Sequence, residues 1–242
     1  MNAAKVSRLG HRWVGLVVGL QLLIWTVSGL YMVAMDLDFI HGDPLVRNVK
    51  PTFDLHDSRV TMAQLTQQRE GAIETLRLRA LPDGRQVYEI GQGGQLSLFD
   101  ANTGARLSPL PESRIADLAR NYYAGTGRVA SIALLSREED RPQEIQTRKL
   151  PLWRVDFDDR LETSLYLHPD TGALVVRRHR FWRWFDFLWS LHIMDYQERT
   201  DVNNWLLRGA TVLGLTLSFF GLWLALFSFP FLQRRRPRRA PS

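Results

Sequence analysis

The chain of 242 residues contains no cysteine. Disulfide bonds, thiolate nucleophiles, iron–sulfur clusters and zinc sites with cysteine ligands are therefore excluded. Acidic residues are missing from both ends, because none precedes Asp36 and none follows Asp201. The sequence also lacks a P-loop, a G-x-S-x-G, an H-E-x-x-H and a dinucleotide-binding fingerprint in its strand–turn–helix context. These absences argue against a hydrolase.

Charge is missing from two long apolar runs, residues 13–35 (23 residues) and 209–232 (24 residues). Each run is long enough to cross about 30 Å of hydrocarbon as a helix rising about 1.5 Å per residue. A cleaved signal peptide is a poor alternative for the first run, which is too long and is followed by no small-x-small site. A buried core helix is a poor alternative for the second run, which five arginines follow.

Basic residues next to these runs predict the orientation. Lys5, Arg8 and Arg12 precede the first run, and the five arginines lie between positions 234 and 239. Positive residues beside a span stay in the cytoplasm, so both termini are expected there and the middle of the chain on the outer side. The formal charge is +6, but residues 36–207 hold 22 basic and 25 acidic residues, a net of −3. The basicity is therefore a topology signal, which anionic lipid can reinforce, and no nucleic-acid partner is expected.

The middle of the chain contains an internal repeat. Alternating strands precede the segment Asp100-Ala101-Asn102-Thr103-Gly104-Ala105, and similar strands precede His168-Pro169-Asp170-Thr171-Gly172-Ala173, 68 residues later. Both segments are typical of tight turns, in which glycine supplies a positive φ. Helices are predicted before the strands, over residues 60–69 and 111–123. Each copy is thus expected to be one helix followed by three or four antiparallel strands.

This repeat resembles the PepSY module, a helix packed on a small antiparallel sheet. The apolar segments resemble those of PepSY-associated transmembrane proteins, at residues 11–16, 26–30, 191–192 and 205–223. The predicted fold is an α+β membrane protein in which two transmembrane helices flank an extracytoplasmic domain of two PepSY-like repeats. The expected segments are an N-terminus (1–12), a span (13–35), two repeats (36–110 and 111–180), an aromatic interfacial helix with its connector (181–204), a second span (205–232) and a tail (233–242).

Two of the six histidines lie beside the apolar runs. His11 precedes the first run, and His192 ends an aromatic stretch that leads toward the second run. Larger relatives include ferric-siderophore reductases, and the resemblance implies b-type haem held by histidines at the membrane edge, here His11 and His192. These two are expected on opposite faces, roughly 30 Å apart, so one haem within a chain cannot use both. His41 is expected on the same face as His192, and each ligand could instead pair with its copy in a symmetric homodimer.

These histidines could instead be interfacial anchors or surface residues, since His, Trp and Arg are common in the headgroup zone of membranes. His56, His168 and His179 are expected to be surface or turn residues. The stretch 181–192 is predicted to be an amphipathic helix at the outer surface, either an anchor or a wall for haem or a partner. Each apolar run also carries small residues at helical spacing, which allow close contact between helices. They are predicted to serve the intrachain helix pair, a homodimer or both, and they are Gly15 and Gly19 in the first run and Ala210, Gly214 and Ser218 in the second.

Two functions compete on the sequence alone. One is a haem-bearing electron-transfer or ferric-reductase component linked to iron uptake, which would act on an extracytoplasmic acceptor such as a ferric chelate. The other is a non-catalytic PepSY module, anchored in the bilayer, that binds or regulates an extracytoplasmic protein. The sequence leaves open whether the chain is an enzyme. The resemblance implies an inner-membrane location.

Overall fold

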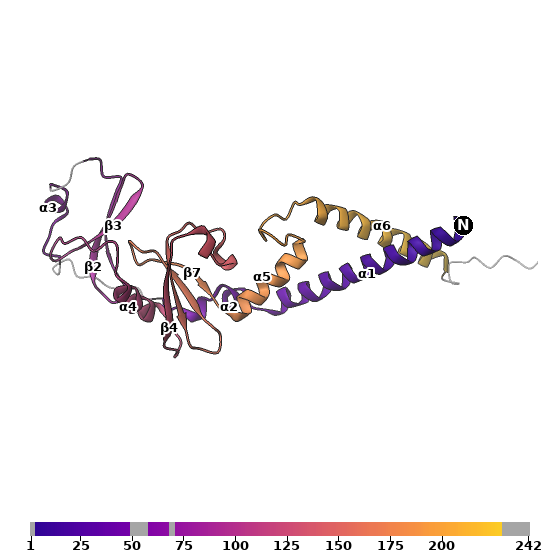
Figure 1. Cartoon of the computed structure of the whole chain (residues 1–242), viewed down its shortest axis with the longest axis horizontal. Coiled ribbons are helices and arrows are strands. Elements are labelled where there is room, and N and C mark those ends of the chain that lie inside the picture. Colours follow the sequence, from indigo (N-terminus) through magenta and orange to yellow (C-terminus); the bar gives the residue numbers. More distant parts are fainter. Residues whose placement is uncertain (1–2, 49–57, 68–70, 229–242) are drawn as a thin grey trace, which may run out of the picture. The chain divides into compact units, whose positions relative to one another are not determined.

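The computed structural model of the chain describes residues 3–48, 58–67 and 71–228. These residues divide into two compact units (Figure 1). The first unit comprises residues 1–34 and 186–242, and the second comprises residues 35–185. Helix α5, Arg180–Ile193, begins in the second unit and ends in the first.

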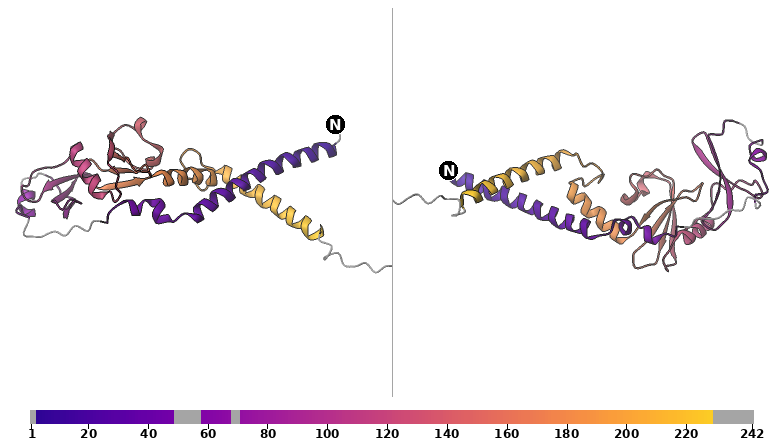
Figure 2. Two further views of the ribbon diagram at one scale, coloured as in Figure 1. Left: turned by 90° about the horizontal axis from the view of Figure 1, so that it is seen from below. Right: turned by 180° about the vertical axis from the view of Figure 1, so that it is seen from behind.

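The first unit contains both long apolar helices, α1 (Ala3–Ala34) and α6 (Trp205–Ser228). Each is long and apolar enough to cross a membrane, over Arg12–Ala34 and Trp205–Trp223. Only 11% and 6% of these stretches are buried within the chain, whereas the core helix of a soluble protein would be mostly covered. The views of Figure 2 show α1 and α6 crossing at an angle. The last four residues of the predicted second span, 229–232, lie outside the described residues.

The second unit begins with two short helices, α2 (Leu37–His41) and η1 (Asp43–Leu45). The Asp36 carboxylate accepts a hydrogen bond from the Phe39 amide at 2.8 Å and so caps α2. Gly42 ends the helix with a φ of 79°, a left-handed conformation that suits glycine. The sequence therefore places a sharp turn shortly after the end of the first apolar helix.

The first sheet has three antiparallel strands in the order β1-β2-β3, and helix α3 precedes it in the chain. Gly93 and Gly94 form the two-residue turn between β2 and β3, with φ values of 59° and 74°. Two consecutive positive φ values are the requirement of the tight hairpin turn that matches strand twist. The elements are α3 (Met62–Gln67), β1 (Thr75–Ala80), β2 (Gln86–Gln92) and β3 (Gln95–Asp100).

The second sheet has four antiparallel strands in the order β4-β5-β6-β7, and helix α4 precedes it. Two 3-10 helices, η3 and η4, lie in the connection between β4 and β5. The elements are α4 (Glu112–Tyr122), β4 (Val129–Leu135), η3 (Glu138–Asp140), η4 (Gln143–Ile145), β5 (Leu152–Phe157), β6 (Ser164–Leu167) and β7 (Leu174–Arg178).

The two predicted turns have the same backbone pattern. The Gly104 amide donates to the Asp100 carbonyl at 2.8 Å, and the Gly172 amide donates to the His168 carbonyl at 2.8 Å. The Asp100 carboxylate also accepts the Asn102 amide at 2.9 Å, while Nδ1 of His168 accepts the Asp170 amide at 3.2 Å. A histidine thus performs the turn-closing task of the aspartate 68 residues earlier. In the first copy the fourth strand is reduced to a bridge between Phe99 and Arg106.

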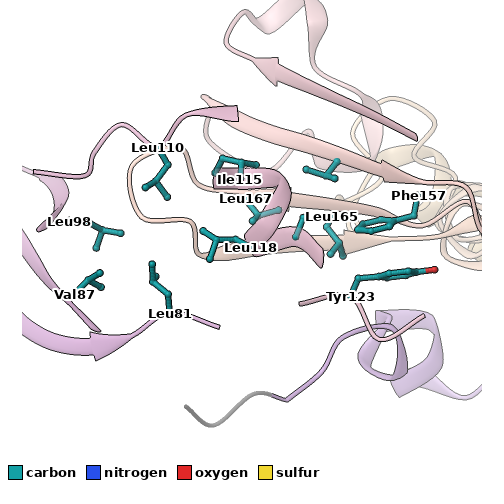
Figure 3. Close-up of a cluster of buried hydrophobic side chains, with 12 residues drawn as sticks. Leu81, Val87, Leu98, Leu110, Ile115, Leu118, Tyr123, Phe157, Leu165 and Leu167 are labelled. Atoms are coloured by element: carbon teal, nitrogen blue, oxygen red, sulfur yellow. The ribbon is translucent and has the colours of Figure 1, made fainter. Parts of the chain in front are cut away.

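Helix α4 packs against both sheets through one continuous core (Figure 3). The first sheet and its turns contribute apolar side chains from one side, and the second sheet contributes them from the other. The core consists of Leu81, Val87, Leu98, Leu110, Ile115, Leu118, Ala119, Tyr123, Val155, Phe157, Leu165 and Leu167. A second cluster contains Leu65 of α3 with Tyr88, Ile90, Phe99 and Ala101, and a third contains Ile145 of η4 with Leu135, Leu152, Tyr166 and Val176.

The predicted mixture of helices and antiparallel strands, with two apolar helices, is confirmed. Within the predicted helix 60–69, α3 covers Met62–Gln67 and so begins two residues later, while residues 68 and 69 lie outside the described residues. The predicted helix 111–123 corresponds to α4, which ends at Tyr122. Pro111 precedes the first turn of α4, where a missing N–H has no cost.

Candidate functional site

His192 lies in the last turn of α5 and contacts the C-terminal third of α1. Its ring nitrogen Nδ1 lies 2.9 Å from the hydroxyl oxygen of Ser28. The indole N–H of Trp25 donates to the backbone carbonyl of His192 at 2.8 Å. A Cβ built on Gly29 would lie 3.6 Å from Cε1 of the same imidazole, so the ring packs directly over this glycine. Three contacts within little more than one turn of α1 therefore fix the imidazole against this helix.

The Ser28 hydroxyl determines which nitrogen of His192 carries the proton. Ser28 is fully buried, and its oxygen lies 2.7 Å from the backbone carbonyl of Ile24, one turn earlier. A hydroxyl has one hydrogen, and the carbonyl can only accept, so Ser28 donates to Ile24. The same hydroxyl oxygen must then accept from Nδ1–H of His192. This assignment follows from the hydrogen-bond network and leaves the lone pair on Nε2.

The free nitrogen gives the site its chemical capacity. Among the described residues, no hydrogen bond to Nε2 of His192 is formed. A neutral imidazole whose Nδ1–H is held by a neighbour presents Nε2 as a metal ligand or a proton acceptor. The sequence alone identified His192 as a candidate ligand, and the structure places it beside a buried serine that orients its ring.

The connector between α5 and α6 fixes the end of α5, where His192 lies. The Asn204 side-chain amide donates to the backbone carbonyl of Ile193 at 2.8 Å, and its carbonyl oxygen caps α6 by accepting the Leu207 amide at 2.8 Å. Arg199 forms an ion pair with Asp186, and its backbone carbonyl accepts the indole N–H of Trp189 at 3.1 Å. The connector thus fixes the end of α5 relative to the start of α6.

Asp195 organises the turn of this connector. Its carboxylate accepts the backbone amides of four residues, at 3.0–3.3 Å: Gln197, Glu198, Thr200 and Asp201. These amides, the Asp201 amide above all, lower the pKa of Asp195 below the usual range of an aspartate. The carboxylate is fully engaged by its own loop, which argues for a structural role.

An apolar groove separates α1 from α6. Its volume is about 380 Å³, and Trp25 and Met194 belong to its wall. Among the described residues of the wall, Gln21 is the only strongly polar side chain, and its buried Nε2 has no hydrogen-bond partner there. No described atom lies within 4 Å of a Cβ built on Gly15 or Gly19.

The other two predicted ligands lie elsewhere. His11 is in α1, 17 residues before Ser28, which corresponds to about 26 Å along the helix axis. Its side chain lies outside the described residues. His41 is the last residue of α2 in the second unit, where it is exposed and its backbone carbonyl accepts a hydrogen bond from Nε of Arg177 at 3.0 Å. Within the described residues, no group of three His, Asp or Glu side chains is arranged to hold a metal ion.

The prediction that His179 is a surface or turn residue is wrong. His179 is 0% exposed, and its Nε2 lies 2.9 Å from the carbonyl of Phe39 and 3.1 Å from that of Ile40. Because both carbonyls can only accept hydrogen bonds, the proton of the ring lies on Nε2. The buried Nδ1 has no hydrogen-bond partner among the described residues. Burial lowers the pKa of His179, because the charged ring would be desolvated. His179 therefore fastens α2 to the end of β7. His56 lies outside the described residues, whereas His168 lies in the predicted turn.

Sequence reasoning missed the partners of His192. Ser28 was visible as one of few polar side chains in the first apolar run, and Trp25 as an indole within it. Polar side chains in a membrane span usually face other protein groups, and this tendency is the signal that could have identified them. The sequence could not pair them with His192, because 164 residues separate the two contacting side chains.

Comparison with protein families gives one match for this chain. The model of the PepSY-associated TM region matches residues 8–241. Comparisons with curated proteins and with solved structures give no match. The family match covers both apolar helices and everything between them. Since it spans nearly the whole sequence, the chain belongs to the family of proteins with a PepSY-associated transmembrane region.

Proposed function

We propose that the chain is a haem-bearing electron-transfer component of a membrane, and that His192 is one axial ligand of a b-type haem. The single observation that carries this proposal is the bond between Ser28 and Nδ1 of His192. Histidines that bind metal usually donate their second ring N–H to a neighbouring acceptor, which fixes the ring and raises the basicity of the ligating nitrogen. His192 has this arrangement before any ligand is added.

The residues around His192 have separate tasks in this proposal. Ser28 keeps the ring proton of His192 on Nδ1, Trp25 fixes the backbone of His192, and the aromatic side chains of α5 exclude water. A bound haem would supply one-electron transfer, at a potential set by the second ligand and by burial. A ferric chelate on the outer side is the proposed electron acceptor. The family resemblance and the charge pattern support an inner-membrane protein with both termini in the cytoplasm.

The second axial ligand is the open part of the site. Within the side chains of the first unit that the structure describes, His192 is the only histidine. His41 of the same chain or the same histidine of a second copy would complete six-coordination, whereas His11 would serve a separate haem site. A homodimer satisfies this need by symmetry, since each chain would supply one imidazole.

An absorption spectrum of the detergent-purified protein tests this proposal. Protein expressed with ample haem should show a Soret band, and dithionite should produce the sharp α and β bands of six-coordinate haem. The His192→Ala variant should lose these bands. His168→Asp is the matched control, because an aspartate occupies the equivalent turn position at residue 100 and accepts the same turn hydrogen bond.

A second candidate function is a non-catalytic module that binds or regulates an extracytoplasmic protein. The observation that favours it is the lone histidine in the described part of the first unit. A featureless spectrum from wild-type protein would contradict the haem proposal and favour this one. An unchanged spectrum in His192→Ala would keep haem but remove His192 from its ligands.

A further inference from the structure

A basic groove runs along the outer edge of the second sheet. Strand β7 ends the order β4-β5-β6-β7, and in the described part of the chain no strand pairs with its other side. Residues of β7, together with His41 and Arg148, enclose a groove of about 260 Å³. Three arginines and one histidine line this groove, and no acidic residue does. Its lining therefore suits an anion.

Two of the arginines are held in place by backbone acceptors. Arg177 donates to the His41 carbonyl at 3.0 Å and forms an ion pair with Asp43. Arg178 donates to the carbonyl of Glu144 at 3.0 Å, and its Cζ lies 3.7 Å from the centre of the Trp182 ring. The carbonyl and the aromatic face orient the guanidinium of Arg178 without cancelling its charge, whereas Asp43 offsets part of the charge of Arg177. One wall of the groove is thus preformed.

The opposite wall contributes a more accessible cation. Arg148 is exposed, and its guanidinium forms no ion pair or hydrogen bond with the described residues. Asp43 brings a carboxylate to the groove through its ion pair with Arg177. Planar guanidinium groups match the oxygens of a phosphate and bind it by paired, charge-assisted hydrogen bonds.

The sequence around the groove indicates where a phosphate would come from. His41 follows the last residue of the apolar helix α1 by seven positions, and Arg178 precedes α5 by two. At the start of α5, Phe181 and Trp184 remain 36% and 55% exposed within the chain. Exposed aromatic rings beside arginines, close in sequence to a membrane span, are typical of the headgroup zone.

We propose that the groove formed by His41, Arg148, Arg177 and Arg178 binds the phosphate of an anionic phospholipid headgroup. The aromatic rings of α5 would contact the glycerol and the first carbons of the acyl chains. This site is separate from His192 and does not depend on haem. It would bind lipid equally in an electron carrier and in a non-catalytic module.

Native mass spectrometry of the full chain, released from micelles doped with phosphatidylglycerol or phosphatidylcholine, tests the proposal. Wild-type protein should retain phosphatidylglycerol in preference to phosphatidylcholine. Arg148→Gln should weaken phosphatidylglycerol retention about five-fold, the effect of one basic residue near an anionic lipid, and Arg148→Glu should weaken it further. Arg148 is suited to this test because it makes no described contact that the fold requires.

Arg77→Gln is the matched control, since Arg77 is an exposed arginine of β1 in the other sheet. Retention equal to wild type in this control, with loss in the Arg148 variants, supports the groove. An equal loss in both would show non-specific attraction and overturn the proposal, as would full retention in Arg148→Glu. Displacement of phosphatidylglycerol by millimolar inorganic phosphate or by an acidic peptide would overturn the lipid assignment in favour of a soluble anion.

Discussion

The most informative residue in the chain is Ser28, because one hydroxyl determines the state of the candidate ligand. It donates to a carbonyl of its own helix at 2.7 Å and accepts from His192 at 2.9 Å. In an apolar setting the serine can satisfy both groups only in this arrangement. The residue that controls the site is therefore a small side chain without charge.

Replacing Ser28 by alanine should free the His192 ring to rotate and to change tautomer. If His192 binds haem, the affinity should fall about 10- to 100-fold, which is typical for the loss of a partner that orients a ligand. Titration of haem into the apoprotein in detergent, followed at the Soret band, measures this effect.

Thr26→Ala is the matched control for Ser28→Ala. The Thr26 hydroxyl donates to the carbonyl of Leu22 at 2.8 Å, in the same helix, and makes no contact with His192. Equal haem affinity in the two variants would remove the Ser28–His192 hydrogen bond from the argument.

His179 should make the stability of the second unit depend on pH. Its pKa is lowered in the folded state by burial first, against the opposing hydrogen bonds to the carbonyls of Ile40 and Phe39, and the charge of Arg183 lowers it further. Between the lowered pKa and about 6.5, the unfolded chain binds more protons than the folded chain. The free energy of unfolding should therefore rise with pH in this window, by at most about 1.4 kcal/mol per pH unit.

Chemical denaturation of the full chain between pH 5 and 8, followed by tryptophan fluorescence, measures this slope. His179→Gln should flatten it and, at pH 7, cost about 1–3 kcal/mol through the lost bonds to Phe39 and Ile40. His41→Gln controls for the loss of one histidine, since its side chain is exposed. A slope that survives in His179→Gln would assign the pH dependence to other groups.

At the scale of elements, α4 is the helix on which both sheets depend. Its buried side chains, Ile115, Leu118 and Ala119, meet Leu98 of the first sheet and Leu165 of the second within one cluster (Figure 3). Gly172 lies so close that a Cβ there would come within 2.4 Å of Leu118. Neither sheet has an alternative cover for this face in the described residues.

Leu118→Ala should destabilise both sheets together. Removing a fully buried leucine leaves a cavity and typically costs about 2–5 kcal/mol. A single unfolding transition should move to lower denaturant, with amide protection lost in β2 and β6 alike when followed by hydrogen exchange. Asp117→Ala, on the exposed side of the same helix, should change stability far less. Protection lost in only one sheet would contradict a shared core.

Local sequence patterns predicted most of these elements. The two turns 68 residues apart were predicted from Gly104 and Gly172, which have positive φ values. The amphipathic spacing of 181–192 predicted α5, which begins one residue earlier and ends one later. Helix α3 begins at Met62, two residues later than its pattern suggested, and places Leu65 in the apolar cluster of the first sheet.

Contacts between distant residues were not predictable from these patterns. His179 lies in the run Arg177-Arg178-His179-Arg180, which is typical of an exposed strand end. Its burial depends on carbonyls of α2, 139 and 140 residues earlier. The same applies to His192, whose partner on α1 could not be identified from spacing. The sequence thus predicted which residue types matter, while the fold determined which of them meet.

At the scale of the whole molecule, the two apolar helices and the family match agree on a membrane protein. The basic residues at both ends predict that the termini share the cytoplasmic side. A reporter fused after Ser242 should therefore be active only if it works in the cytoplasm, and one inserted at the Gly93-Gly94 turn only if it works outside. Cytoplasmic activity at Gly93-Gly94 would overturn the proposed orientation.

The helix shared between the two sheets has a consequence for how this chain can be shortened. The first sheet alone would leave Leu81, Val87 and Leu98 without the helix that covers them. A deletion that removed the second copy would expose this apolar face and favour aggregation. Because both sheets pack on α4, neither can be deleted or exchanged without exposing apolar side chains of the other. The two sheets therefore have to be kept together as one unit.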